Sequence, residues 1–280
     1  MTLGLLHIVY APYGPAALER FLDSYRQRPA GVAHDLILVF KGFAGERLSE
    51  AYYPLLDGLT HRAVFAPDGG FDLGTYFFAA RRCEYERLCF LNSSSVLLAD
   101  DWLAKLCGAF ETPGVGLAGA TGSLESHITN LRRQFRLATC PNPLRRLVRN
   151  QRGLRILLRA GFYFPSFPNV HLRTNAFVID RRQWLTLWAG PFRTKQDCYD
   201  FESGRRSLTR QVQARGLEVR IVGRDGRVYL PAQWYESETF RAGTQRNLLV
   251  ADNQTRQYLA ADAAERRELT RDSWGVTELV

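Results

Sequence analysis

The stretch Leu88-Cys-Phe-Leu-Asn-Ser-Ser-Ser95 decides the fold prediction, because it changes at one point from apolar to polar residues. Its first half is a short apolar run of the kind that forms a buried strand, and Asn92 to Ser95 make a polar loop after it. In open α/β sheets, ligands bind beyond the carboxyl ends of the strands. The stretch therefore predicts a central strand followed by a functional loop.

Strands and helices are expected to alternate on both sides of this stretch. We predict strands at residues 3–10, 35–40, 63–66, 87–92, 116–120, 175–179 and 218–222. We predict helices at residues 15–27, 48–56, 72–86, 102–110, 181–187 and 207–215. Such alternation is typical of βαβ units, so the sequence predicts an α/β fold with a mainly parallel sheet flanked by helices.

The composition is that of an ordinary globular protein, with 46% hydrophobic and 23% charged residues in 280. No apolar run is long enough to cross a membrane, and we interpret the apolar start as a buried strand rather than a signal peptide. The five cysteines are odd in number and lack Cys-x-x-Cys spacing, which favours reduced thiols over a zinc site or a disulfide framework. A cytoplasmic location is therefore expected.

The net charge of +9 is carried almost wholly by arginine. Residues 126–179 contain ten arginines and no acidic residue. We interpret residues 126–172 as a basic helical insertion in a single domain that spans residues 1–280. Residues 3–125 then form one half of the domain, residues 173–230 the other half, and residues 231–280 a tail. A basic region of this kind attracts phosphates, anionic lipid or nucleic acid.

The order of four motifs resembles the glycosyltransferase family 2 pattern. These are His7-Ile-Val-Tyr-Ala-Pro-Tyr13, Asp35-Leu-Ile-Leu-Val-Phe40, Gly70-Phe-Asp-Leu-Gly-Thr-Tyr76 and Leu88-Cys-Phe-Leu-Asn-Ser-Ser-Ser95. The resemblance covers most of residues 3–120 and, more loosely, 173–222. It implies a GT-A-like fold and the transfer of a sugar from a nucleotide-sugar donor to a glycan or lipid-linked acceptor, in cell-surface polysaccharide synthesis. It also implies donor contacts at Pro12, Tyr13, Asn92, Ser93 and Ser94.

The resemblance departs from the family at the Asp-x-Asp motif, which matches Asn92 and Ser94. In the family, two carboxylates hold a divalent cation that neutralises the leaving nucleoside diphosphate. Asn92 and Ser94 bring no charge, so affinity for Mn²⁺ or Mg²⁺ should be low. Either the reaction needs no metal or another carboxylate replaces the motif; Asp100 and Asp101 are near, but helix capping is their simplest interpretation.

Without a metal, the leaving diphosphate still needs positive charge. Lys41 and Arg173 are candidates, although Lys41 is equally interpreted as a solvated strand end. Asp72, between glycines, is predicted to contact ribose or sugar hydroxyls; the alternative is that its carboxylate fixes the local turn.

An inverting transferase also needs a general base that takes the proton of the acceptor hydroxyl. In the resembled family an acidic residue near the start of a late helix does this. The corresponding segment here places Glu202 first, Asp200 second and Asp197 third. Acidic residues at this position also serve as helix caps, and that alternative stays open.

Three other functions compete with the transferase. A nucleotidyltransferase would need a glycine-rich loop after the first strand, and Ala11 to Gly14 is a poor one. A nucleic-acid partner is not expected, because no known motif is present. A non-catalytic scaffold, or a protein that binds an anionic surface, remains an alternative.

The basic insertion suggests that the protein binds such an anionic surface. Residues 143–164 can be interpreted as an amphipathic helix whose arginines contact an anionic membrane or a lipid-phosphate acceptor, which would make the protein a peripheral membrane enzyme. The alternative is a core-packed helix with solvated arginines. The arginines assigned to this contact are Arg145, Arg146, Arg149 and Arg152.

Overall fold

In the computed structural model, which describes residues 2–137 and 155–276, eight strands form one sheet in the order β11-β10-β6-β9-β4-β1-β2-β3. Six of them run in the same direction, while β9 is antiparallel to β4 and β6, and β11 is antiparallel to β10. The prediction of a mainly parallel α/β sheet is confirmed. The strands are β1 (Leu3–Tyr10), β2 (Asp35–Lys41), β3 (Arg62–Ala66), β4 (Arg87–Leu91), β6 (Val115–Gly119), β9 (Ala176–Asp180), β10 (Glu218–Val222) and β11 (Val228–Tyr229).

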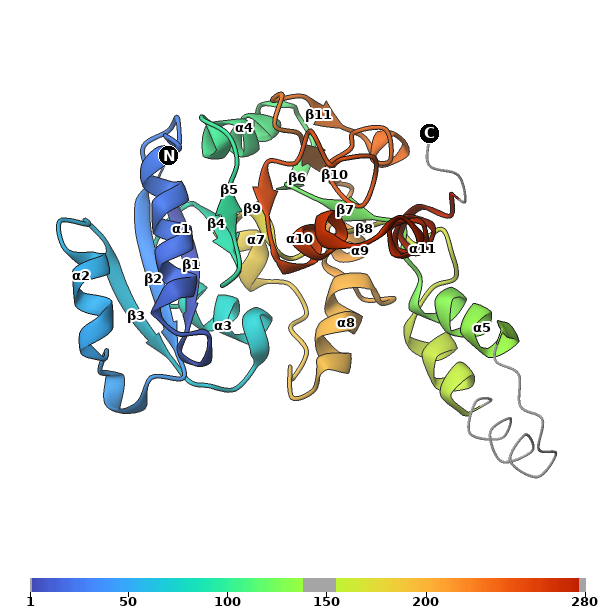
Figure 1. The fold of residues 1–280 in the computed structure, drawn as a ribbon, viewed down its shortest axis with the longest axis horizontal. Helices are drawn as coiled ribbons and strands as arrows, with labels where there is room; N and C mark the ends of the chain where they lie inside the picture. The colour runs from blue at the N-terminus through green and yellow to red at the C-terminus, as the bar shows by residue number, and fades with distance from the viewer. Residues whose placement is uncertain (1, 138–154, 277–280) are drawn as a thin grey trace.

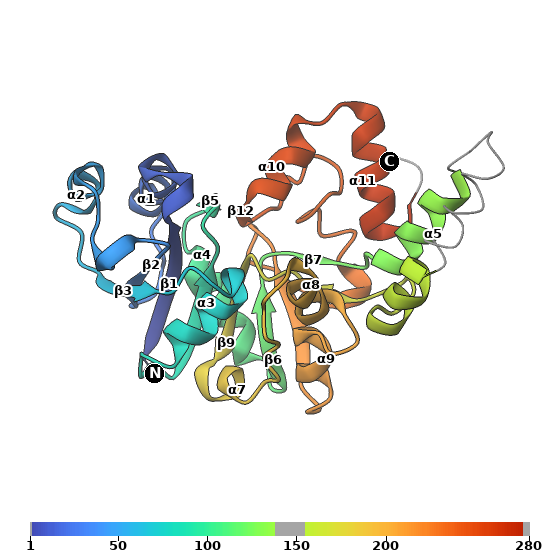
Figure 2. The ribbon, with the colours of Figure 1, turned by 90° about the horizontal axis from the view of Figure 1, so that it is seen from below.

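Helices cover both faces of the sheet, and each face has its own apolar core (Figures 1 and 2). The central strand β1 is buried along nearly its whole length, as expected for a parallel strand between two helical layers. Leu6 and Ile8 belong to one core, and Leu5 and Val9 to the other. The larger helices around the sheet are α1 (Pro15–Gln27), α3 (Phe71–Ala80), α4 (Trp102–Gly108), α7 (Arg181–Leu185), α8 (Lys195–Ser203) and α9 (Leu208–Gln213).

Short elements complete the chain between these. The 3-10 turns are η1 (Ala11–Tyr13), η2 (Ala44–Glu46), η3 (Glu50–Tyr52), η4 (Ala109–Glu111) and η5 (Pro231–Gln233), and α2 (Tyr53–Leu56) is a single helical turn. Two pairs of two-residue strands lie outside the main sheet: β5 (Val96–Leu97) with β12 (Val250–Ala251), and β7 (Gly122–Ser123) with β8 (His171–Leu172).

The C-terminal segment returns to the edge of the sheet where β1, β2 and β4 end. Strand β12 pairs with β5, which closely follows the Asn92 loop, and α10 (Asn253–Ala260) begins directly after β12. Helix α11 (Ala263–Trp274) then packs onto the body of the protein, where the indole N–H of Trp274 donates to the carbonyl of Phe240 at 2.8 Å. This return places Asp252 to Gln254 beside the carboxyl ends of strands that come much earlier in the chain.

An arm extends from the body of the protein at its C-terminal half (Figures 1 and 2). It consists of α5 (His127–Leu137) and a helix at residues 155–163, which pack together through Ile128, Ala160 and Phe164. The predicted membrane contacts Arg145, Arg146, Arg149 and Arg152 lie outside the described residues. Among the helices that the structure describes, none is both long and apolar enough to span a bilayer.

Several predicted helices are longer than those observed: the helix predicted at 48–56 is only η3 and α2, and the helix predicted at 181–187 ends at Leu185. The helix predicted at 72–86 ends at Ala80, and the helix predicted at 102–110 passes into the 3-10 turn η4 after Gly108. Asp101 occupies the N-cap position of α4, but it has a left-handed backbone (φ 57°) and makes no side-chain capping bond. Asp100 forms an ion pair with Arg28 at 3.3 Å instead. Asp101 therefore stands at the predicted cap position without the side-chain hydrogen bond of a cap, and Asp100 does not cap the helix.

Candidate functional site

A cavity of about 400 Å³ lies at the edge of the sheet where β1, β2 and β4 end. The antiparallel β9 begins at this same edge, so residues 173–175, just before it, reach the cavity as well. Pro12, Asp197 and Asp200 are not among the residues that line it. The lining residues include the predicted Tyr13, Lys41, Asp72, Asn92, Ser93, Ser94, Arg173 and Glu202, together with Tyr10, Phe71, Leu73, Thr174, Asn175, Lys195, Cys198, Tyr199, Asp252, Asn253 and Gln254.

Aromatic side chains form one wall of the cavity. Tyr10 ends β1 and Tyr13 lies in η1, and their rings meet edge to face with centroids 5.2 Å apart. Tyr13 is 55% exposed, so one face of its ring is available to a planar ligand. Pro12 is exposed and lies beside Tyr13 in the same turn. This wall offers a stacking surface of the kind that accepts a nucleobase.

Lys41 supplies an unpaired positive charge. It is the last residue of β2 and only 5% exposed, and its ammonium lies 5.3 Å from the centre of the Tyr10 ring. Burial lowers the pKa of Lys41, although the nearby carboxylates of Asp72 and Asp68 partly oppose this. Within residues 2–137 and 155–276 no hydrogen bond or ion pair engages the ammonium. Lys41 is therefore not a solvated strand end, which was the alternative from the sequence, because its side chain is buried at the wall of the cavity.

Asp72 and Lys195 carry two further charges of the cavity. Asp72 lies in the first turn of α3, where burial raises the pKa of its carboxyl. The positive charges of Lys41 and Lys195 lower this pKa, and the negative charge of Glu202 raises it. In the part of the chain that the structure describes, no backbone N–H donates to the Asp72 carboxylate, as the turn-fixing alternative would require. Two ammonium groups and two carboxylates therefore influence one another across the cavity.

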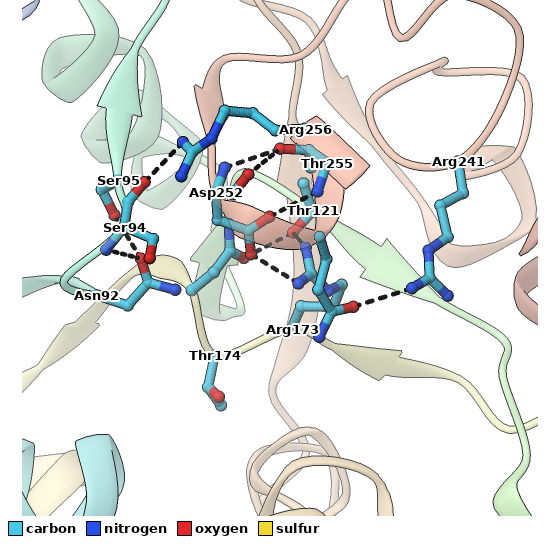
Figure 3. Close-up of polar contacts among 12 residues, drawn as sticks. Asn92, Ser94, Ser95, Thr121, Arg173, Thr174, Arg241, Asp252, Thr255 and Arg256 are labelled. Atoms are coloured by element: carbon cyan, nitrogen blue, oxygen red, sulfur yellow. Dashed lines mark hydrogen bonds and ion pairs between the residues drawn. The ribbon is translucent and has the colours of Figure 1, made fainter. Parts of the chain in front are cut away.

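The loop at Asn92 is closed by its own hydrogen bonds (Figure 3). The Asn92 Oδ1 accepts from the backbone N–H of Ser94 at 3.1 Å and from the hydroxyl of Ser95 at 3.0 Å. Arg256 fixes the loop from outside, because its Nη1 donates to the Ser94 carbonyl at 2.9 Å. The amide oxygen of Asn92 is thus already used in the local turn.

These residues do not fit a divalent cation held at the Asp-x-Asp position. A hard cation needs several oxygen ligands, preferably carboxylates, and Asn92 and Ser94 offer no carboxylate and one amide oxygen that is already bonded. Among the described residues, no three His, Cys, Asp or Glu side chains lie close enough together to form a metal site.

Arg173 lines the cavity, but its charge is balanced (Figure 3). Its Nη2 forms an ion pair with Asp252 at 2.7 Å, its Nη1 donates to the Thr121 hydroxyl at 3.3 Å, and its guanidinium lies 4.1 Å from the centre of the Phe240 ring. Burial alone would raise the pKa of Asp252, but Arg173 and the Thr255 amide and hydroxyl together hold that pKa below its usual value. The pair therefore joins the start of β9 to the start of α10.

Glu202 is the predicted general base that faces the cavity. It lies in the last turn of α8, and its Oε2 accepts from the backbone N–H of Thr174 at 2.8 Å and from the Thr174 hydroxyl. Asp197 instead forms a capping box with Thr194 at the start of α8, and hydrogen bonds from the Thr194 and Arg193 amides lower the pKa of its carboxyl. Of the three candidates, Glu202 alone is placed to reach a ligand in the cavity.

Two charged residues that line the cavity, Lys195 and Asp252, are not among the predicted site residues. Lys195 carried a signal, because it is one of only three lysines in a chain with 34 arginines, and Lys41 is another. The polar segment Asp252 to Thr255 is typical of sugar sites as well as of helix caps, and the cap was the preferred interpretation; Asp252 does cap α10, and its other oxygen binds Arg173. Cys198 is the one cysteine among the lining residues, and burial and the nearby carboxylates raise its pKa to about 12, so the thiol stays protonated.

No family model and no curated protein matches this sequence. Similar solved structures include a glucosyl-3-phosphoglycerate synthase from Mycobacterium tuberculosis in complex with Mn²⁺, UDP and glucosyl-3-phosphoglycerate, with 13% identity and a TM-score of 0.39 over 65% of this chain and 57% of that chain. A mannosyltransferase from Pyrobaculum calidifontis in complex with GDP-Man and Mn²⁺ has 13% identity and a TM-score of 0.41 over 78% and 53% of the two chains.

A 4-diphosphocytidyl-2C-methyl-D-erythritol synthase from Anaerococcus prevotii has 12% identity and a TM-score of 0.44 over 79% of this chain and 88% of that chain. The chain thus spans a little over half the length of the synthase from Mycobacterium tuberculosis and of the mannosyltransferase.

Proposed function

We propose that this chain is a nucleotide-sugar glycosyltransferase that binds its donor in the cavity at the carboxyl ends of β1, β2 and β4. The observation that carries the proposal is the combination of side chains in this one cavity. An exposed aromatic ring at Tyr13, lysines at Lys41 and Lys195, and a carboxylate at Glu202 all line it. Transfer from a nucleotide-sugar donor needs these three kinds of group: an aromatic surface for the nucleobase, positive charge for the diphosphate and a general base for the acceptor hydroxyl.

In the proposed complex the nucleobase stacks on Tyr13, and the diphosphate lies toward Lys41 and Lys195. Asp72, in the first turn of α3, accepts hydrogen bonds from ribose or sugar hydroxyls. Arg173 holds Asp252 and the start of α10 in place and does not itself neutralise the phosphates. The Asn92 and Ser94 loop shapes the floor of the cavity through its closed turn.

The proposed reaction is an inverting displacement at the anomeric carbon. The acceptor hydroxyl gives its proton to Glu202, and its oxygen forms the new bond to the anomeric carbon. The bond from that carbon to the diphosphate oxygen breaks, and the electron pair leaves with the nucleoside diphosphate. The extra negative charge on the leaving group develops near Lys41 and Lys195, where fixed positive charge lowers the barrier.

We further propose a hexosyl donor and a glycan or lipid-linked acceptor, as in cell-surface polysaccharide synthesis. The sequence resemblance supports this acceptor class. A cytoplasmic location stays a prediction from the sequence.

Nucleotide binding provides the direct test. We expect calorimetry with uridine, guanosine, cytidine and thymidine diphosphates to show saturable binding of one of them, and Tyr13→Ala to weaken it while the control Tyr53→Ala leaves it unchanged. Tyr53 is 58% exposed in α2, outside the cavity. If none of the four binds, the transferase proposal is wrong. Binding without sugar transfer to any acceptor would favour the scaffold alternative.

Chelation provides a second prediction. Because the Asn92 loop lacks carboxylates and Lys41 and Lys195 supply positive charge, we expect nucleoside diphosphate affinity and turnover to be largely retained in EDTA. The measurement is calorimetry and initial rates with EDTA, with Mg²⁺ and with Mn²⁺. Complete loss in EDTA that either cation restores would show that another carboxylate of the cavity holds a metal.

A further inference from the structure

The helix at residues 155–163 has two different faces. Leu157, Ala160 and Phe164 recur at helical spacing and pack against Ile128 and Leu131 of α5. The arm therefore has a small apolar core of its own. On this face the helix is packed against a core, as in the alternative that the sequence left open.

The opposite face is apolar and basic at once. Arg155, Leu158, Arg159 and Phe162 follow the spacing i, i+3, i+4 and i+7, which places them on one side of the helix. Leu158 is 67% exposed and Phe162 is 75% exposed, and both arginines are exposed as well. Large apolar side chains in such an exposed position mark an interaction surface.

The charge of this face is not neutralised within the described residues. No carboxylate there forms an ion pair with Arg155 or Arg159, whereas Arg133 of α5 is paired with Asp272 and Glu268 of α11. No acidic residue occurs in residues 126–179. The exposed face therefore combines unpaired cations with apolar side chains.

We propose that this exposed face, Arg155, Leu158, Arg159 and Phe162, docks on an anionic membrane surface. The arm projects from the body of the protein, so a flat surface can reach it (Figure 2). Leu158 and Phe162 then enter the boundary between headgroups and acyl chains, and the arginines meet the lipid phosphates.

The positive charge of this face also makes a second copy of the chain an unfavourable partner for it. A two-fold contact through this face would place the arginines of both copies against one another, and like charges across an interface are unfavourable.

The arm adjoins the cavity at its base. The ring of His127, the first residue of α5, lies 4.9 Å from the ring of Tyr199 and 4.7 Å from the ring of Phe164, measured between centroids. Tyr199 in turn lines the cavity. The arm is thus connected to the cavity through His127 and Tyr199. This step, which rests on the proposed function, makes a lipid-linked hydroxyl the acceptor.

Co-sedimentation with vesicles tests the docking proposal. We expect the protein to bind vesicles of phosphatidylcholine with phosphatidylglycerol and to bind pure phosphatidylcholine much more weakly. Since a basic residue near an anionic surface changes affinity by a factor of about five, Arg159→Ser should weaken binding about fivefold, and Arg159→Ser with Phe162→Ser should weaken it further. The matched control is Arg47→Ser with Tyr53→Ser, which changes exposed residues around η2 and α2, at the opposite end of the molecule (Figure 1).

Each variant is also checked by circular dichroism and by nucleoside diphosphate calorimetry, which should match the wild type, so a failed docking proposal is distinguishable from a failed transferase proposal. Equal binding to both kinds of vesicle, or equal loss in the control pair, would overturn the docking proposal. So would a concentration-dependent dimer that Phe162→Ser abolishes, because the face would then bind a second copy.

Discussion

Replacement of Glu202 by glutamine is expected to lower turnover by about a hundredfold or more while donor binding survives. Glutamine keeps the size of the side chain and retains an oxygen that can accept from the N–H and hydroxyl of Thr174. It cannot take a proton from the acceptor. The substitution therefore removes the proposed base and leaves the hydrogen bonds that fix the side chain. Initial rates with the donor identified by calorimetry measure the loss.

Two neighbouring carboxylates serve as controls for Glu202. Asp200→Asn changes a residue that is outside the cavity lining, and turnover should stay near that of the wild type. Asp197→Asn weakens the capping box of α8, so it should lower stability by about 1 kcal/mol and leave the chemical step intact. Near-normal turnover in Glu202→Gln would transfer the role of base to Asp200 or Asp197.

The main strands could be predicted well because each is a short apolar run between turn residues. Strands β1 and β10 have the predicted limits, and β2, β4 and β9 differ by about one residue. Helix α3 was predicted too long, because apolar residues such as Cys83 and Tyr85 continue the pattern after the helix ends at Ala80. Cys83 is buried there without being helical. Two-residue strands such as β5 and β12 carry no sequence signal, because their pairing depends on how the C-terminal segment returns.

The candidate site could be predicted where it follows from the topology of the sheet. Lys41 and Asn92 each lie at the carboxyl end of a parallel strand, and such ends meet at one edge. The pairing of Arg173 could not be predicted, because its partner Asp252 follows 79 residues later in the chain. The closed turn of Asn92 and the burial of Lys41 likewise depend on packing. The residue types could be predicted, but not which of them remain free to bind a ligand.

Replacement of Lys41 by methionine is expected to lower turnover by about a hundredfold to a thousandfold, the usual loss when one group that stabilises developing charge is removed. The ammonium has no hydrogen bond or ion pair among the described residues, so its charge is available to the diphosphate. Methionine has a similar length and suits the buried site. Initial rates and diphosphate calorimetry measure the effect. The control is Lys105→Met, because Lys105 lies in α4 and donates to the Asp100 carbonyl at 2.8 Å, away from the cavity.

Thermal unfolding and pH separate this role from a structural one. Burial of an ammonium group is unfavourable, so Lys41→Met should keep or raise the Tm even as turnover falls. Burial also lowers the pKa of Lys41, so the lysine should lose its charge at a lower pH than an ordinary lysine does. Diphosphate affinity should therefore be greatest below this lowered pKa and decline as the pH rises through it. Lys41→Arg stays charged and should remove that decline. If the decline persists in Lys41→Arg, or if Lys41→Met turns over at the wild-type rate, the charge that stabilises the diphosphate comes from elsewhere, and Lys195 is the next candidate.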